Sequence, residues 1–219
     1  MKLQSTAPLF IFTAFATILR AATPLPVARP EEVGMSSDRL QRIGAFVERL
    51  ESGGQISGAV TAVARHGRLV RLEAQGFGDL ETRRAMRPDD IFALASMTKP
   101  IVTVGVLMLL EEQRLLLSDP VEKYLPEFSK PQVAVADAGA PGGYRVVPAQ
   151  RSITIHDLLI HRSGVASTNG PAGAILREAQ RALPPDAVLA DQVRALASAP
   201  LNFQPGAKWE YGASTNVLG

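Results

Sequence analysis

The sequence predicts an α/β protein in which an antiparallel sheet domain precedes a mainly helical domain. A helical pattern and two strand patterns occupy the chain before residue 80, and the pattern is mainly helical from Ser96 onward, with no third clear strand. The expected divisions are a signal segment over residues 1–22, the N-terminal part of the α/β domain over 23–95, and the helical domain over 96–219.

The first domain can be divided into elements by residue spacing. Ser36 or Ser37 can cap a helix, because the apolar residues that follow recur at intervals of three and four. Two runs rich in β-branched and apolar residues follow, at 56–65 and 68–78. His66–Gly67 between them fits a tight turn, so the two runs are predicted to form a hairpin.

The helical half contains a short helix with clear boundaries. Thr154 can cap it, and Asp157 stands three positions later, as in a capping box. His161 falls in the expected last turn, and Gly164 can take the left-handed position that ends a helix.

Two further segments of this half have contrasting patterns. Residues 185–200 read as an amphipathic helix that ends before Pro200. Residues 130–150 are rich in Pro, Gly and Ala, and we expect a long surface loop there, bordering the active-site cleft.

Composition excludes several classes of function. The 219 residues are 46% hydrophobic, and the net charge of +2 comes from scattered charges, which predicts no nucleic-acid partner. The chain has no cysteine, so disulfides and thiolate sites are excluded. No nucleotide or zinc-protease fingerprint occurs, and His156 and His161 do not share a helix face, so we expect no cofactor and no metal.

The N-terminus is typical of an export signal. Lys2 precedes an apolar run over residues 7–22 that ends in small residues, and the run is too short for a stable membrane span. The sequence therefore predicts an exported protein, periplasmic or secreted. The alternative is an irregular arm packed on the domain.

Ser96 and Lys99 stand at the start of a strongly apolar helix. Pro100 is tolerated only near a helix start, so the helix is expected to begin at about Ser96. Residues 101–110 are almost wholly apolar, which predicts a helix covered on every side. A spacing of three places the hydroxyl and the amine on one face, and burial there would lower the pKa of the lysine. This pairing predicts a serine nucleophile that works without histidine.

Three segments, in order, resemble one superfamily. Residues 91–128 are similar to the active-site segment of the serine β-lactamases and penicillin-binding proteins, in particular the class C-like branch that includes the family VIII carboxylesterases. Residues 153–165 resemble its helix-and-turn signature, and 203–219 its segment with PG, Trp and Tyr. The resemblance implies the β-lactamase/transpeptidase-like fold, with the C-terminal strands missing from this chain, which is expected to be truncated.

By this resemblance Ser96 is the acylated nucleophile, Lys99 its proton-handling partner and Tyr211 a second acid/base group. The backbone amide of Ser96 would supply half of an oxyanion hole. Whether Lys99 or Tyr211 takes the first proton is left open by the sequence.

The resemblance implies a serine hydrolase that forms an acyl-enzyme on a small-molecule ester or lactam. Many relatives have Asn where this chain has Ala213, and that difference favours a carboxylesterase. A β-lactamase or D-alanyl-peptide carboxypeptidase is the alternative within the family. A catalytically silent penicillin-recognition or interaction module is the alternative outside enzymology. Two Ser-x-Asn strings, at 167–169 and 214–216, are expected to be coincidental, and the oligomeric state is open.

Overall fold

The computed structural model describes residues 24–167 and 172–219, and it divides the chain into two compact units. The first unit ends at Phe92 and the second begins at Ala93, a few residues before the boundary expected at residue 95. The predicted signal segment lies outside the described residues. Among the described residues, none of the helices has both the length and the apolar character needed to cross a membrane.

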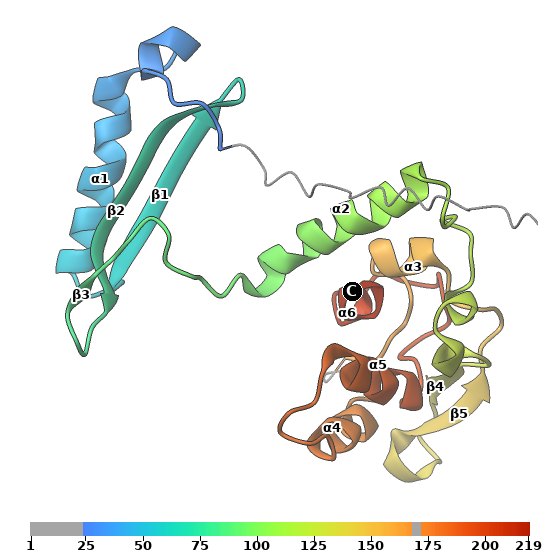
Figure 1. Ribbon diagram of the computed structural model, residues 1–219. Coiled ribbons are helices and arrows are strands. Elements are labelled where there is room, and N and C mark those ends of the chain that lie inside the picture. Colours follow the sequence, from blue (N-terminus) through green and yellow to red (C-terminus); the bar gives the residue numbers. More distant parts are fainter. Residues whose placement is uncertain (1–23, 168–171) are drawn as a thin grey trace, which may run out of the picture. The chain divides into compact units, whose positions relative to one another are not determined.

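The first unit is one helix packed on a small antiparallel sheet (Figure 1). Helix α1 spans Ser37–Ser52, and strands β1 (Gly58–Arg65), β2 (Arg68–Asp79) and β3 (Arg84–Ala85) lie in the order β1-β2-β3. Helix α1 packs against β1 and β2, and its residues Leu40 and Val47 are buried.

The helix cap and the hairpin predicted for the first unit are confirmed, but the expectation of no third clear strand is wrong, because the two-residue strand β3 pairs with β2. The Ser36 hydroxyl accepts a hydrogen bond from the amide of Arg39, which makes Ser36 the N-cap of α1. His66 and Gly67 both have positive φ values, 50° and 69°, as a two-residue turn with primed geometry requires. Local side-chain chemistry was therefore sufficient to place these elements.

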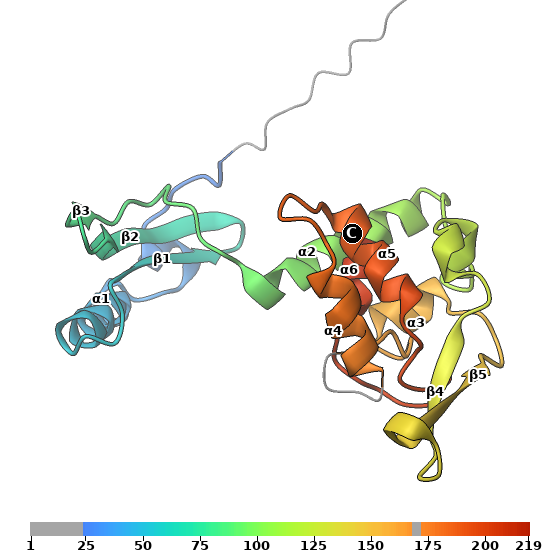
Figure 2. The same cartoon turned by 90° about the horizontal axis from the view of Figure 1, so that it is seen from below.

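The second unit is mainly helical and encloses the larger core (Figure 2). Its helices are α2 (Thr98–Glu111), α3 (Ile155–Leu159), α4 (Gly173–Arg181), α5 (Leu189–Ser198) and α6 (Ser214–Leu218). Short 3-10 turns are η1 in the first unit (Pro30–Val33) and, in the second, η2 (Ala95–Met97), η3 (Val121–Lys123), η4 (Pro126–Phe128) and η5 (Pro141–Gly143). The core centres on Val121, Val133, Leu158 and Leu176, each at most 2% exposed.

The prediction of a long surface loop over residues 130–150 is wrong, because this segment forms a β-hairpin. Strands β4 (Gln132–Ala136) and β5 (Tyr144–Pro148) pair antiparallel, and Val133 is buried in the core. The Gly- and Pro-rich turn dominated the composition of the segment. It concealed the short runs on either side, whose β-branched valines favour a strand.

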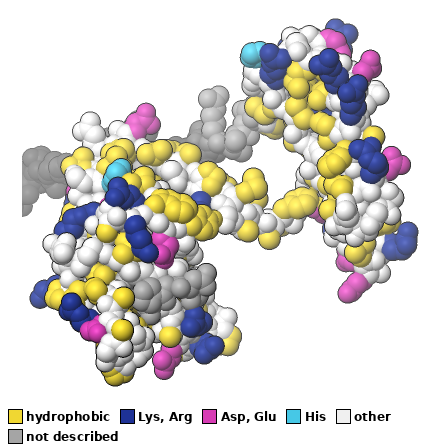
Figure 3. Space-filling model, turned by 180° about the vertical axis from the view of Figure 1, so that it is seen from behind, with side chains coloured by type: hydrophobic (Ala, Val, Ile, Leu, Met, Phe, Trp, Pro, Cys, Tyr) yellow, Lys and Arg dark blue, Asp and Glu magenta, His cyan; other side chains and the backbone are white. Residues whose placement is uncertain are grey.

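Helix α2 is not covered on every side. Val106 is buried in the core cluster that also contains Val217 of α6, but Ile101, Val104 and Met108 are each more than half exposed among the described residues. Figure 3 shows such uncovered apolar side chains on the surface. Apolar residues on every face of a helix show that it could be buried. Whether it is buried depends on which other elements pack against it.

The end of α3 also differs from the prediction. The capping box of Thr154 and Asp157 is present, but the helix ends at Leu159, and His161 takes the left-handed conformation (φ 56°) that was expected at Gly164. Gly164 has a positive φ as well, in the turn that follows. His161 therefore leaves the helix axis, which matters for the site described below.

Candidate active site

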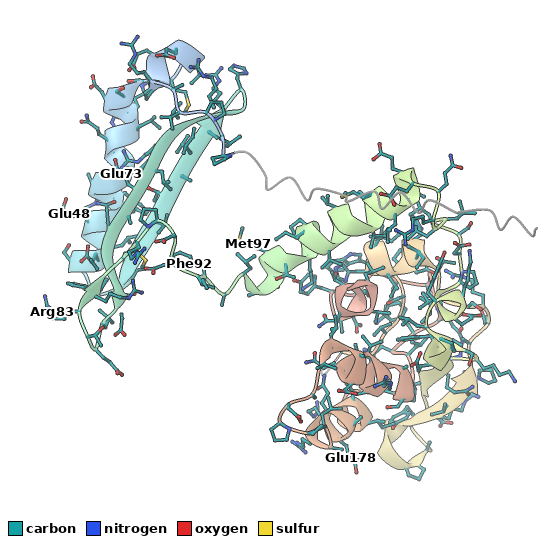
Figure 4. All side chains as sticks on the ribbon, viewed as in Figure 1. Glu48, Glu73, Arg83, Phe92, Met97 and Glu178 are labelled. Atoms are coloured by element: carbon teal, nitrogen blue, oxygen red, sulfur yellow. The ribbon has the colours of Figure 1, made fainter. Side chains whose placement is uncertain are left out.

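Ser96 lies in the 3-10 turn η2, immediately before α2. The preceding residue, Ala95, has a φ of 45°, a left-handed conformation that costs an alanine about 1–2 kcal/mol. Met97, next to Ser96, points away from the start of the helix (Figure 4) and is 69% exposed. This local geometry presents the serine hydroxyl at the N-terminal end of α2, where the helix dipole favours negative charge.

Lys99 lies one turn further along the chain. Its ammonium donates a hydrogen bond to Ser96 Oγ at 3.4 Å, so the two side chains meet as the spacing predicts. The buried setting expected for this pair is wrong for the described residues, because Ser96 is exposed and Lys99 is half-buried.

Tyr211 reaches the same hydroxyl from a distant part of the chain. Its phenol donates a hydrogen bond to Ser96 Oγ at 2.8 Å, and Lys99 Nζ lies 4.7 Å from the centre of its ring. The structure thus brings all three sequence-predicted site residues together around one oxygen atom.

Backbone pairing between two segments positions Tyr211. The amide of Asn202 donates to the carbonyl of Gly164 at 2.7 Å, and the amide of Glu210 donates to the carbonyl of His161 at 2.9 Å. A Cβ on Gly164 would overlap the carbonyl oxygen of Phe203, so the close approach of these segments requires glycine.

The neighbours of Tyr211 favour its ionised form. The hydrogen bond with Ser96 lowers the pKa of the Tyr211 phenol, and the hydrogen bond and positive charge of Lys99 lower it further. The Tyr211 phenol therefore loses its proton more readily than an isolated tyrosine, and it lies within hydrogen-bond distance of Ser96 Oγ.

Glu210, next to Tyr211, links several segments of the second unit. Its carboxylate accepts hydrogen bonds from the side-chain amide of Asn202 at 2.6 Å and from the Ser167 hydroxyl at 3.1 Å. Lys208 forms an ion pair with it at 3.2 Å. Burial raises the pKa of Glu210, but these three partners outweigh burial and hold it below its usual range. The carboxylate is thus fully engaged as a structural anchor.

Sequence reasoning missed one residue of this site, His161. Its ring centre lies 5.0 Å from that of Tyr211, with the rings tilted by 33°. Its position near the end of a short capped helix could have indicated a left-handed residue, which is common there. No local pattern indicated the contact with Tyr211, because the two rings are fifty positions apart in the sequence.

The two Ser-x-Asn strings lie in different surroundings. Ser214 begins α6 and shares a buried 2.8 Å hydrogen bond with the hydroxyl of Ser163, whereas Asn216 is exposed. Ser167 bonds to Glu210, and the remainder of its string lies outside the described residues.

A pocket of about 270 Å³ adjoins the lysine. Its lining is partly apolar and comprises Ala95, Thr98, Lys99, Val102, Leu189, Thr215, Asn216 and Gly219. Within the described part of the chain, no three His, Asp or Glu side chains gather in a way that could hold a metal ion.

Comparison with known proteins identifies relatives of the chain. Esterase EstB of Burkholderia gladioli is 39% identical over 183 residues, which are 81% of this chain but only 43% of EstB. Protein Rv1367c of Mycobacterium tuberculosis is also 39% identical, over 80% of this chain and 43% of its own length. The chain thus spans less than half the length of these relatives.

Solved structures give the same grouping. The hydrolase EstCE1, which has promiscuous acyltransferase activity, superposes with a TM-score of 0.64 at 28% identity, over 82% of this chain and 45% of its own. Simvastatin synthase (LovD) of Aspergillus terreus superposes with a TM-score of 0.65 at 26% identity, over 84% and 46%. Residues 43–219 match the profile of the family described as Beta-lactamase. With that match covering most of its length, the chain belongs to the beta-lactamase family and has the β-lactamase/transpeptidase-like fold.

Proposed function

We propose that the protein is a serine hydrolase that acts through an acyl-enzyme on Ser96, and that its substrates are carboxylic esters. The observation that carries this proposal is the convergence of the Lys99 ammonium and the Tyr211 phenol on Ser96 Oγ. A nucleophile and a proton acceptor within hydrogen-bond distance are what activation of a serine requires.

In the proposed mechanism Tyr211 is the first base. As a phenolate it accepts the proton of Ser96, while the Lys99 ammonium balances the charge. Ser96 Oγ then attacks the ester carbonyl, the bond to the alcohol oxygen breaks, and the alcohol leaves with the proton that Tyr211 held. Water subsequently cleaves the acyl-serine with Tyr211 again as base. The shorter distance to Tyr211 and the direction of its pKa shift support this assignment over Lys99.

Esters are proposed as substrates on two grounds. Among the relatives, EstB is named as an esterase and EstCE1 is described as a hydrolase. Ala213 also offers no side-chain amide beside Tyr211 with which to recognise an amide bond. The adjoining pocket supports a small or medium acyl group, because Val102 and Leu189 give it an apolar side.

The second candidate is a β-lactamase or D-alanyl-peptide carboxypeptidase. The family name favours it, and it would use the same serine chemistry on an amide.

We also propose that the protein is exported, on the pattern of Lys2 followed by a short apolar run. Comparison of periplasmic and cytoplasmic fractions would test export.

Labelling with a fluorophosphonate tests the acyl-enzyme. In the full-length protein the probe should add its mass to the peptide that contains Ser96, and S96A should abolish both the adduct and ester turnover. S129A, which removes an exposed serine outside the site, serves as the control and should leave both intact. Absence of any adduct on a folded protein would favour a silent recognition module.

A further inference from the structure

His161 contacts the ring that carries the proposed base. Its imidazole lies tilted against Tyr211, and Trp209 stands edge-on to the imidazole with 6.2 Å between ring centres. Tyr211 therefore has a flat neighbour on one side, while Lys99 lies 4.7 Å from the centre of its ring. Because Tyr211 is otherwise half exposed, it depends on ring contacts of this kind to restrict its rotamers.

The backbone holds the imidazole in place independently of its side-chain contacts. His161 has a left-handed conformation, and its carbonyl accepts the amide hydrogen of Glu210, the residue before Tyr211. One residue pair thus connects the two segments both through the main chain and through the rings. A backbone shift of this segment would disturb both contacts, whereas a rotation of the Tyr211 side chain would disturb only the contact between the rings.

The imidazole is suited to remain uncharged. Nδ1 of His161 is buried and has no hydrogen-bond partner among the described residues. Burial lowers the pKa of His161, and the positive charge of Lys99 lowers it further. Tyr211 and Trp209 face the imidazole from the other segment.

Two further charged residues lie near the imidazole in the chain or through the backbone. Arg162, the next residue, is cationic and bonds to the carbonyl of Gly206, so it would oppose a positive charge on the imidazole. Glu210, whose amide bonds to the His161 carbonyl, directs its carboxylate to Asn202, Ser167 and Lys208 and is not bonded to the imidazole in the described structure.

We infer that His161 is a positioning residue, whose neutral ring holds the phenol of Tyr211 at hydrogen-bond distance from Ser96. This inference rests on the proposed function, since it concerns how the proposed base is aimed. Displacement of a catalytic group by about 1 Å can cost about 10²-fold in rate, so loss of the ring should slow turnover without weakening substrate binding.

A double-mutant cycle in the full-length protein tests the inference. H161A should lower kcat at least about 10-fold with KM changed less than about 2-fold, whereas H161F, which keeps a flat ring, should stay within about 3-fold of the parent. In a Y211F background H161A should have almost no further effect on kcat. H156A is the matched control, because His156 is exposed on α3, and it should change neither constant.

Two outcomes would overturn the inference: a loss in H161A that persists undiminished when Tyr211 is already Phe, or a loss in H161F as large as in H161A. H161L, which fills the space without a flat ring, replaces H161A if the latter does not fold, as judged by thermal melting.

A spectroscopic titration separates this inference from the proposed function. The ultraviolet absorbance of tyrosinate, assigned by its loss in Y211F, should show a pKa for Tyr211 below the usual value near 10 in the parent. In H161A that pKa should move back toward the usual value. This readout requires no turnover, so it tests His161 even if Ser96 is never acylated, and an unchanged titration would count against the positioning role.

Discussion

Ser96 and Tyr211 are 115 positions apart in the chain, and their side-chain oxygens lie 2.8 Å apart. No regular element contains both residues. The contact depends on the pairing of residues 161–164 with 202–210, and it is the part of the site most sensitive to how the second unit folds.

Removal of the Tyr211 hydroxyl should reduce kcat by about 10²- to 10⁴-fold with little change in KM, because acid–base groups act mainly in the transition state. Steady-state kinetics of Y211F on a short-chain aryl ester would measure this. Y144F is the matched control, since Tyr144 lies in β5 and its hydroxyl has no hydrogen bond in the described structure. Equal losses in both variants would contradict the role of Tyr211.

Removal of the Lys99 charge should affect Tyr211 as well as Ser96. In K99M the pKa of the Tyr211 phenol should rise, because the ammonium beside its ring lowers it. The pH–rate profile of K99M should therefore shift to higher pH, and kcat/KM should fall. Both would be measured from about pH 6 to about 11, a range that includes the reference pKa of tyrosine. K130M, which removes an exposed lysine, should leave the profile unchanged.

Gly164 should not tolerate a side chain. G164A combines a left-handed strain of about 1–2 kcal/mol with an overlap of its Cβ on the Phe203 carbonyl. G143A is a matched control, because Gly143 has a similar φ of 78° but open space where a Cβ would lie. Thermal melting should show a larger loss for G164A, and ester turnover should fall only in that variant.

Asp119 should contribute to stability in a defined range of pH. Hydrogen bonds from the Tyr124 hydroxyl, the Leu116 amide and Lys123 lower its pKa from 3.8 to about 2. The contribution is therefore complete above pH 3.8 and is lost as the pH falls toward 2. Acid titration of D119N should show a smaller decline of stability in that range than the parent, whereas D186N, at an exposed aspartate, should follow the parent curve.

Substrate preference should respond to position 213. A213N adds an amide that can pair with the carbonyl or N–H of a lactam, so the ratio of cephalosporin to aryl-ester turnover should rise. The comparison of kcat/KM for both substrates measures this ratio. Rapid cephalosporin hydrolysis by the parent protein would instead rank the β-lactamase candidate first.

How far the sequence predicts the structure depends on the range of the interaction. The Ser36 cap, the His66–Gly67 turn and the Thr154–Asp157 capping box each depend on interactions within a few residues. Each was therefore predicted from the local sequence. The proximity of Ser96 and Lys99 follows from helical spacing alone.

The features that sequence reasoning missed are long-range or masked by composition. The place of Tyr211 beside Ser96 came from family resemblance, because no local pattern joins residues so far apart. His161 was assigned to a helix that ends two residues earlier, so its contact with Tyr211 could not be anticipated. The hairpin β4–β5 was hidden by its own turn residues.

Strand β4 of that hairpin pairs with the segment that leads to Tyr211. The amide of Ala134 donates to the carbonyl of Leu201 at 2.8 Å, and the amide of Leu201 donates to the carbonyl of Gln132 at 2.7 Å. A fluctuation that broke these two bonds would free the strand edge and loosen the chain leading to the phenol, without melting the helices. The rate of deuterium uptake at the Leu201 amide would therefore report how often this strand edge opens, and with it the chain that leads to the tyrosine.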